Sequence, residues 1–459
     1  MNILCFDISS GGISGALFDS ELRAVRYAEV QWDAATLSVP GVIAQFQTII
    51  NDLKPTTDDN IGAICLDTFL HNCVLLDAVD QPLTPVFTWL DHRGMDGVEF
   101  IRTRMGDDFH QRTGCRFHPM FPVFKLASMR LTGNSALTAV KRIVSIKCLL
   151  NHGLTNTWVE DLGIASSSGL FNVNDGSWDL EILGHLQLST DCLPPVASRT
   201  AIVGTVTREA AARFGLPEGI RVVNGTGDGF AANIGSGCET ADRIAVTLGT
   251  SGVVRQTLTR PVLASESGTF CYVADRNVYV LGCAGSNGGN VLDWGRSIFG
   301  ASADPGAATD PPIFIPLLNG ERSPEWDPNL TGSWYRLTSR HTAADLSRSI
   351  LEGVVFNLAY FVEIIEATSG AGASAIVLSG NGFLNPLAAP ILAAVIRVPV
   401  FMPEEPGLIT LCGTAICARR ALGLENPPLR SHQVLALNDP KILHRYAEYR
   451  RFRGTLGRA

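Results

Sequence analysis

The sequence predicts an α/β protein of two domains, and three observations support this prediction. The chain has 459 residues, about three times a typical domain length of roughly 150 residues. Hydrophobic residues make up 46% and charged residues 17%, which suffices for sizeable cores and excludes a disordered chain. A strand, a tight Gly/Ser turn and a second strand occur twice, about half the chain apart. We therefore expect two related α/β halves that meet near residue 240, although two unrelated hairpins would give the same pattern.

The first half contains several short apolar runs that are bounded by polar residues, which is typical of buried strands. In order, we expect a strand at Ile3–Asp7, a turn at Ser9–Gly12, a strand at Gly15–Phe18, a strand at Arg23–Trp32, a helix at Pro40–Leu53 and a strand at Ile61–Leu66.

The second half repeats the opening pattern and adds a long helix. In order, we expect a strand at Ile244–Leu248, a turn at Gly249–Gly252, a strand at Val253–Leu258, a loop at Ala301–Pro312, a helix at Leu346–Glu366, a strand at Ala375–Ser379, a loop at Gly380–Gly382 and a helix at Leu384–Ile396. The long helix carries apolar residues three and four positions apart. Its wide stripe fits a domain core, a bridge between the halves, or a face for a second copy in a homodimer.

Composition excludes several classes of protein. The net charge is −8 and the pI is near 5.6, so we expect no nucleic acid partner. Eleven cysteines without a Cys-x-x-Cys pair argue against a disulfide framework and a zinc site. Met1–Asp7 has no basic segment typical of a signal peptide, and Phe383–Phe401 is interrupted by polar residues and prolines, so we expect no membrane span. These features predict a cytoplasmic protein.

The two turns of small residues are candidate anion sites. A turn without bulky side chains leaves backbone N–H groups free to surround a phosphate, and Gly249–Gly252 adds two hydroxyl donors. Asp7 ends the first strand beside the first turn. A carboxylate there can hold Mg²⁺ through water, because magnesium dehydrates reluctantly. Alternatively, Asp7 is a strand-end residue that accepts hydrogen bonds from nearby N–H groups.

Asp228 is the candidate general base. The segment Val222–Asn233 runs from a strand through a glycine loop into a small-residue helix, and Asp228 falls where that helix begins. Its carboxylate can take a proton from a substrate hydroxyl, and the flanking glycines let a ligand approach closely. Alternatively, Asp228 is the N-cap of the helix, a common role for aspartate.

The chain resembles the FGGY carbohydrate kinases over nearly its whole length, because many of their sequence blocks occur here in order. The matching blocks are Asp7–Asp19, Leu70-His71 with Val74–Asp77, Trp89-x-Asp91-x-Arg93, Met120–Met129 with Pro122 and Lys125, Thr226–Gly229, Gly249–Gly252, Gly320–Pro328, Gly332–Glu352, Ser379–Gly382 and Gly407–Ala418. Thr113-Gly114, His118–Met120 and Ser168–Asn172 are most similar to gluconate kinases. Xylulose kinases share many of the other blocks.

This resemblance implies two actin-like (ribonuclease H-like) domains with a cleft between them. Residues 1–240 would form the N-terminal FGGY domain, which binds the sugar and carries the catalytic Asp228, and residues 241–459 the C-terminal, ATP-binding domain. The implied activity is transfer of the γ-phosphate of ATP to a hydroxyl of a small sugar or sugar acid, gluconate-like or xylulose-like. Mg²⁺ near Asp7 would neutralise the phosphates.

The resemblance also assigns the binding residues. N–H groups of Ser10, Gly11, Gly249, Thr250 and Ser251 would hold the phosphates, Gly380, Asn381 and Asn385 would border the adenosine, and His71, Trp89, Asp91 and Arg93 would line the sugar side. A sugar acid needs a cation opposite its carboxylate, and Arg93 is our first choice over Lys125 and His118.

Three of these residues have alternative interpretations. Arg93 could instead pair with Asp91 or Asp96, His71 could be a core histidine, and Lys125 could lie on a solvated helix face.

The first phosphate motif departs from the family pattern. The family reads Asp-x-Gly-Thr with a Lys or Arg a few residues on, whereas this chain has Ser9, Ser10 and Ser14. The missing cation predicts weaker attraction to the ATP phosphates. It leaves two alternatives to a sugar kinase: a catalytically weakened sugar or nucleotide sensor on the same fold, and an ATPase of the wider actin-like group that acts on another metabolite.

Overall fold

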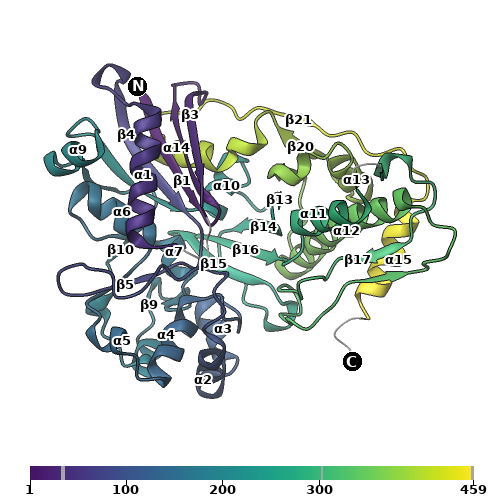
Figure 1. The fold of residues 1–459 in the computed structure, drawn as a ribbon, viewed down its shortest axis with the longest axis horizontal. Helices are drawn as coiled ribbons and strands as arrows, with labels where there is room; N and C mark the ends of the chain where they lie inside the picture. Colours follow the sequence, from purple (N-terminus) through teal and green to yellow (C-terminus); the bar gives the residue numbers. More distant parts are fainter. Residues whose placement is uncertain (33–36, 301–302, 456–459) are drawn as a thin grey trace.

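The computed structural model describes residues 1–32, 37–300 and 303–455 as two lobes, each built around its own sheet (Figure 1). The expected loop Ala301–Pro312 begins at residues 301–302, which lie outside the described residues. Within its described part, a short 3₁₀ turn, η5 (Pro305–Ala307), interrupts the loop.

The first sheet confirms the strands predicted in the first half. Its six strands lie in the order β11-β12-β4-β1-β2-β3: β1 (Asn2–Ser9), β2 (Gly12–Phe18), β3 (Ala24–Gln31), β4 (Ile61–Thr68), β11 (Ile202–Thr205) and β12 (Arg221–Gly227). β1 pairs with β2 in antiparallel and with β4 in parallel orientation. One face packs on an apolar layer from α1 (Val39–Leu53), α6 (Ile146–Thr155) and α9 (Arg208–Phe214).

The second sheet confirms the strands predicted in the second half. Its seven strands lie in the order β15-β16-β14-β13-β19-β20-β21: β13 (Arg243–Leu248), β14 (Gly252–Leu258), β15 (Phe270–Asp275), β16 (Val278–Ala284), β19 (Ala375–Ser379), β20 (Val400–Pro403) and β21 (Ser431–Gln433). The predicted long helix is α12 (Ala343–Ser369). Its stripe, including Ile350, Val354 and Phe361, is buried against this sheet inside the chain, so a domain core accounts for the pattern.

The predicted helix at Leu384–Ile396 is wrong at its start. The segment begins with a 3₁₀ turn, η6 (Asn381–Leu384), and the helix α13 covers only Ala388–Val395. Asn385 precedes Pro386 and has an extended backbone, because the proline ring disfavours helical geometry in the residue before it. The predicted loop Gly380–Gly382 is therefore partly 3₁₀.

Two helices lie between the sheets: α10 (Asp228–Gly235) and α14 (Ile409–Ala421) (Figure 1). α14 lies between β20 and β21 of the second sheet in sequence but packs on the first sheet, in a cluster that includes Cys5 and Cys65. The two helices cross with their backbones in contact. A Cβ on Gly235 would lie 2.0 Å from the Ile409 carbonyl oxygen, and one on Gly413 would lie 1.9 Å from that of Ala231. Larger residues would push the helices, and with them the lobes, apart.

Many of the remaining elements form a cap on the first lobe. The remaining elements are β5 (Val74–Leu76), β6 (Arg142–Val144), β7 (Glu160–Asp161), β8 (Phe171–Asn172), β9 (Ser177–Trp178), β10 (Val196–Ala197), β17 (Ile313–Ile315), β18 (Ser333–Tyr335), α2 (Met95–Met105), α3 (Asp108–Thr113), α4 (Pro122–Leu131), α5 (Ser135–Ala139), α7 (Leu162–Ser166), α8 (Leu180–Leu186), α11 (Gly289–Phe299) and α15 (Ile442–Arg453), with the 3₁₀ turns η2 (Thr57–Asp59), η3 (Thr190–Cys192), η4 (Ser265–Ser267) and η7 (Pro406–Leu408). Of these, α11 and η7 contribute to the cavity described below. The β15–β16 hairpin packs Phe270 and Tyr272 into the cap. Among the described helices, none has the length and apolar character required to cross a membrane.

Candidate active site

A cavity of about 990 Å³ opens between the two lobes. Its walls combine residues of the first sheet, the central helices and the second lobe. Of the residues predicted for the site, seven line it: Asp7, Asp228, Gly249, Thr250, Gly380, Asn381 and Asn385. The fold thus brings together both candidate acids, the second turn and the predicted adenosine residues, which are up to 378 positions apart in the sequence.

Asp228 is placed by an unusual strand-to-helix junction. The predicted glycine loop is wrong, because β12 continues to Gly227 and α10 begins directly at Asp228. The strand tolerates its glycines through an irregularity in its pairing with β4. There Gly225 has φ 74°, and a Cβ on it would lie 1.7 Å from the Leu66 carbonyl oxygen. The N-cap is Gly227, so the alternative reading of Asp228 as the N-cap is also wrong.

The surroundings of Asp228 raise the pKa of its carboxyl group to about 7. Burial is the largest cause, since it disfavours the charged form, and the neighbouring Asp7 carboxylate adds repulsion. Arg255 and the N–H groups of Gly229 and Leu70 oppose the shift; the Gly229 N–H donates to Asp228 Oδ1 at 2.6 Å. A carboxylate with a pKa near neutrality suits proton abstraction at physiological pH.

Asp7 lies in a row of polar residues that crosses the first sheet. It is directly opposite Ser14 on β2 and Asp67 on β4, and Ser14 is opposite Glu29 on β3. Residues that pair in this way share one face of a sheet. Burial raises the pKa of Asp7, and raises that of Asp67 more strongly because Asp7 lies beside it. Ser14 stands where the family pattern has a Lys or Arg. The row therefore contains three acidic side chains, Asp7, Asp67 and Glu29, and no basic side chain.

The surroundings of Asp7 fit a magnesium ion that arrives with the nucleotide. Asp7 Oδ1 is buried and has no hydrogen-bond partner among the described residues. Among the residues that the structure describes, no group of three or more His, Cys, Asp or Glu side chains is placed so that it could hold a metal ion. Mg²⁺ is usually bound by one or two carboxylates together with water and phosphate oxygens, not by an all-protein cage. A single carboxylate oxygen without a hydrogen-bond partner, lining the cavity, is compatible with that mode.

The backbone N–H groups of both turns are partly used within the turns. Gly11 N–H donates to Ser9 Oγ at 3.2 Å, and Gly249 N–H donates to the Ser251 carbonyl oxygen at 3.0 Å. The carbonyl of Ser10 accepts the indole N–H of Trp32 at 3.0 Å. Gly249 and Gly11 therefore need a change in these hydrogen bonds before their N–H groups can bind phosphate.

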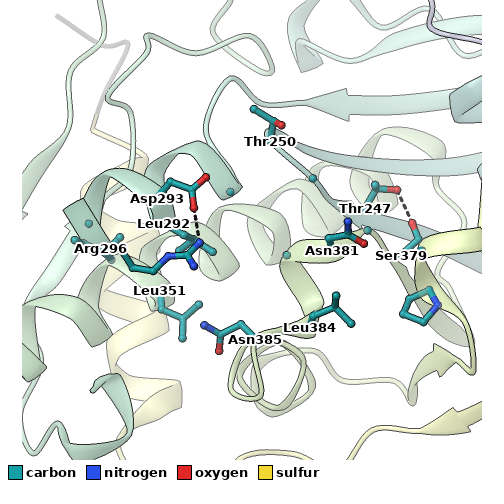
Figure 2. A pocket seen from close by; sticks show the side chains of 18 of the residues that line it. Thr247, Thr250, Leu292, Asp293, Arg296, Leu351, Ser379, Asn381, Leu384 and Asn385 are labelled. Carbon is teal, nitrogen blue, oxygen red and sulfur yellow. Dashed lines mark hydrogen bonds and ion pairs between the residues drawn. The ribbon is translucent and has the colours of Figure 1, made fainter. Parts of the chain in front are cut away.

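The predicted adenosine residues surround the outer end of the cavity (Figure 2). Asn381 and Asn385 come from η6 and the residue that follows it. Leu384 lies beside them on η6, and an apolar wall with a charged edge, formed by Leu292, Asp293, Arg296, Ile350 and Leu351, also lines this cavity. Gly380 is required here, since it has φ 91° and a Cβ on it would lie 2.5 Å from the Leu248 carbonyl oxygen.

The predicted sugar residues do not line this cavity, and His71 belongs to a separate basic cluster. We define the basic cluster as His71, His118, Lys125 and Arg322. His71 Nδ1 is 2.7 Å from the Ser167 carbonyl oxygen. Burial lowers the pKa of His71 and of His118 to about 3, and the positive charges of Arg322 and Lys125 contribute. His71 is buried, so both its core and its pocket interpretations remain compatible with the structure.

The structure places Arg93 and Lys125 differently from what the sequence led us to expect. The Arg93 Nη2 lies 2.5 Å from Asp91 Oδ2, and the Arg93 side chain is 63% exposed, so the alternative pairing with Asp91 is the arrangement found. Lys125 is 2% exposed, which makes the solvated-face reading wrong. Its Nζ donates to the carbonyls of Pro119 at 2.9 Å and Met120 at 2.8 Å, and burial lowers its pKa to about 8.

Two contacts join the basic cluster to the cavity. Leu70 precedes His71 and contacts the strand end beside Asp228, since a Cβ on Gly227 would lie 2.3 Å from the Leu70 side chain. Arg322 donates to the carbonyl oxygen of Gly285 and, at 3.3 Å, to Ser251 Oγ in the second turn. Its guanidinium lies 5.4 Å from the Trp89 ring centroid. Asp228 therefore lines the cavity next to the point where the segment of His71 reaches the end of β12.

Several polar residues of the site were missed in the sequence. Asp67, Arg255 and Thr414 carry buried polar groups near the cavity, and Asp67 accepts a hydrogen bond from Thr414. Arg322 lies in a motif that the sequence did single out, but with no role attached. The available signal was a charged residue inside an apolar strand, as at Asp67 in β4 and Arg255 in β14.

Comparisons with known proteins agree with this geometry. The model of the FGGY family of carbohydrate kinases, N-terminal domain, matches residues 20–235, and that of the C-terminal domain matches residues 244–422. A gluconokinase of Bacillus licheniformis is 30% identical over 435 residues, covering 88% of this chain and 84% of that protein. The crystal structure of a gluconate kinase from Lactobacillus acidophilus superposes with a TM-score of 0.91 at 25% identity, covering 100% of this chain and 98% of the other.

A ligand-bound xylulose kinase from Lactobacillus acidophilus also has a TM-score of 0.91, at 26% identity, with 100% of this chain and 99% of the other covered. These matches confirm the predicted fold class of two actin-like domains. They include both gluconate and xylulose kinases, so they do not discriminate between these two substrates.

Proposed function

Because this chain belongs to the FGGY family of carbohydrate kinases, we propose that Asp228 is the general base of a reaction that phosphorylates a small sugar acid. The chain is a phosphotransferase with an alcohol group as acceptor, and ATP is its phosphoryl donor. The observation that carries the proposal is the position of Asp228, which lines the cavity next to the point where the segment of His71 reaches the end of β12.

Asp228 takes the proton of the acceptor hydroxyl as that oxygen attacks the γ-phosphate. Phosphoryl transfer needs little covalent help from the protein, because it depends on alignment and charge compensation. A positioned base contributes about 10²- to 10⁴-fold in rate. The Gly229 N–H donates to Asp228 Oδ1 at 2.6 Å, and this hydrogen bond helps to hold the carboxylate at the cavity, where it meets the hydroxyl.

The second lobe holds the nucleotide in this proposal. Gly249 and Thr250, which line the cavity, bind the phosphates together with Ser251 and with Ser10 and Gly11 of the first lobe, which do not line it. Gly380, Asn381 and Asn385 border the adenosine against the apolar wall. Mg²⁺ bound through water near Asp7 supplies charge neutralisation at the β- and γ-phosphates. The division of labour follows the two proposed domains, with residues 1–240 for the sugar and Asp228, and residues 241–459 for ATP.

The basic cluster favours a sugar acid over a neutral sugar. Lys125 and Arg322 are 2% and 8% exposed. The hydrogen bonds of Lys125 go to two carbonyl oxygens, and those of Arg322 go to a carbonyl and a hydroxyl oxygen, so neither charge is matched by a carboxylate in these contacts. A buried positive charge without an opposite charge beside it is unfavourable unless a bound anion compensates it. We therefore assign the substrate carboxylate to Lys125 and Arg322, in place of Arg93, and His71, Trp89 and Asp91 to the sugar hydroxyls. A gluconate-like acid fits this assignment better than a xylulose-like ketose.

A coupled assay of ADP release tests the proposed function. Gluconate, xylulose, ribulose and glycerol are supplied in turn with ATP and Mg²⁺. We expect the highest kcat/KM with gluconate, and loss of this turnover in Asp228→Ala. The matched control is Asp293→Asn, which removes a carboxylate from the same cavity wall and should leave kcat within about threefold.

Three outcomes would contradict the proposal. ADP release that is indifferent to every sugar would favour an ATPase for another metabolite. Sugar binding without ADP above background would favour the sensor that the altered first turn suggests. A higher kcat/KM with xylulose than with gluconate would refute the sugar-acid assignment.

A further inference from the structure

We infer that Arg255 is a positioning residue for Asp228: its guanidinium, reaching from the second sheet to the first turn of α10, holds the Asp228 carboxylate in its ionised, proton-accepting state. This inference rests on the proposed role of Asp228 as the general base.

Arg255 is a charged residue inside a buried strand. It lies on β14 between Ala245 on β13 and Gly282 on β16, and it is 8% exposed. Its Nη1 donates to Thr247 Oγ1 at 3.2 Å. Thr247 Oγ1 is in turn 2.8 Å from Ser379 Oγ, and both hydroxyls line the cavity (Figure 2). The side chain thus runs behind the cavity wall toward the central helices.

The guanidinium lies directly against the start of α10. A Cβ built on Gly229 would lie 3.1 Å from Arg255 Nε and 3.3 Å from both Cζ and Nη2. Any side chain at position 229 would press on the guanidinium. Since Gly229 immediately follows Asp228, this contact places a positive group beside the helical turn that carries the proposed base.

Arg255 has no structural ion pair that would explain its burial. Across the described parts of the chain, no carboxylate lies within 4.0 Å of it, unlike the buried Arg445, which contacts Glu352 at 2.7 Å. A buried guanidinium without a partner is unfavourable. The charged groups that face Asp228 are Asp7 on β1, Asp67 on β4 and Arg255 on β14. Arg255 is thus the positive charge that offsets the repulsion from the two aspartates.

The expected consequence is a change in the pH dependence of turnover. Burial and Asp7 favour the protonated form of Asp228, whereas Arg255 favours the ionised form. Removing the positive charge therefore raises the pKa of Asp228. The acid limb of the kcat–pH profile should move to higher pH, and kcat at pH 7 should fall because less of the enzyme holds an ionised base.

The test compares Arg255→Gln with Arg255→Lys. Glutamine keeps a polar side chain but lacks the charge, whereas lysine keeps the charge. We expect Arg255→Gln to move the acid limb up by about one pH unit and to lower kcat at pH 7 about fivefold, as the ionised fraction of a group with a pKa of about 7 requires. We expect Arg255→Lys to leave the limb within about 0.3 units. Equal profiles for the two variants would overturn the inference.

Gln256→Leu is the matched control for loss of a buried hydrogen bond in the same strand. Gln256 is the next residue, points to the other face, and donates to the carbonyls of Ala241 and Ala371. Its substitution should lower thermal stability without moving the acid limb; a limb that moved as far as in Arg255→Gln would show a merely structural effect and overturn the inference.

If Arg255→Gln does not fold, a second variant still tests the inference. Thr247→Val removes the hydroxyl that anchors Arg255 with little change in shape, and should move the acid limb in the same direction by less. An unmoved limb in Thr247→Val, or an effect of Arg255→Gln confined to KM for ATP, would contradict the inference. If Asp228→Asn stays active, the proposed base itself fails. If Asp228→Asn is inactive but Arg255→Gln keeps the wild-type profile, only the present inference fails.

Discussion

The two strand–turn–strand hairpins of this protein share a shape but differ in support and charge. The first, β1–β2, has Asp7 in a row with Asp67, Ser14 and Glu29. Its turn is closed by its own Ser9 side chain. The second, β13–β14, is buttressed by α11, whose Gly289 and Asn290 N–H groups donate to the carbonyls of the turn at 2.8 and 3.1 Å.

The charges near the two hairpins have opposite signs. Arg322 contacts the second turn through Ser251, and Arg255 lies on β14 itself, whereas the first hairpin contributes carboxylates. Phosphate oxygens are attracted to guanidinium groups and repelled by carboxylates. This difference in charge supports the proposed division of work, in which the first lobe supplies the base and the acid near the metal, and the second lobe holds most of the anionic nucleotide.

The largest expected effect comes from distorting the second turn. In Gly288→Ala, the new Cβ would lie 2.6 Å from the Ser251 carbonyl carbon. Because a displacement of about 1 Å can lower a rate about 10²-fold, we expect kcat/KM for ATP to fall about 10²-fold. Gly11→Ala is the matched change in the first turn, where the nearest atom would be Ser9 Oγ at 4.0 Å. It should stay within about threefold, and an equal loss in both variants would contradict the division between the lobes.

A moderate effect is expected when a cation is added to the first hairpin. In Ser14→Lys, the ammonium group would project from β2 on the same face as Asp7 and Glu29. A charge pair near the surface contributes up to ~1 kcal/mol, or about fivefold, so KM for ATP should fall by about that factor at low salt. Ser14→Met controls for side-chain length. No change relative to Ser14→Met would mean that the first turn does not contact the phosphates.

The smallest effect concerns stability. The pKa of Asp228 is raised in the folded protein to about 7, so its stabilising contribution is present at low pH and is lost as pH rises through about 7. Asp228→Asn has no such ionisation. Its Tm relative to wild type should therefore increase between pH 5 and pH 8, as measured by thermal melts across that range. A Tm difference that is independent of pH would contradict the raised pKa.

Local patterns in the sequence predicted much of the fold. The strands of both hairpins and the long α12 were found because their apolar residues repeat with the periods of strands and helices. Asp7 and Asp228 could be recognised because each lies within two residues of the end of a strand, β1 or β12, beside glycines or serines. The start of α13 was misplaced because the apolar stretch continues through Asn385-Pro386, where the backbone cannot be helical.

The residues that the sequence did not reveal were missed for one physical reason: their contacts come from distant parts of the chain. Arg255 lies against α10, a helix of the other lobe. Asp67 accepts a hydrogen bond from Thr414, which is 347 residues away in the sequence. Lys125 has the spacing of an exposed helical residue, yet its ammonium group turns inward to two carbonyls. No local periodicity reports a partner that only the tertiary fold supplies.

The central claim is that Asp228 removes the proton during phosphoryl transfer, and single-turnover kinetics of Asp228→Asn test it most directly. Enzyme in excess over ATP is mixed with saturating gluconate, and binding of ADP and gluconate is measured on the same preparation by calorimetry. The account predicts a rate of phosphoryl transfer that is lower by about 10²- to 10⁴-fold, with both dissociation constants within about threefold of wild type. A transfer rate within a few-fold of wild type would contradict it.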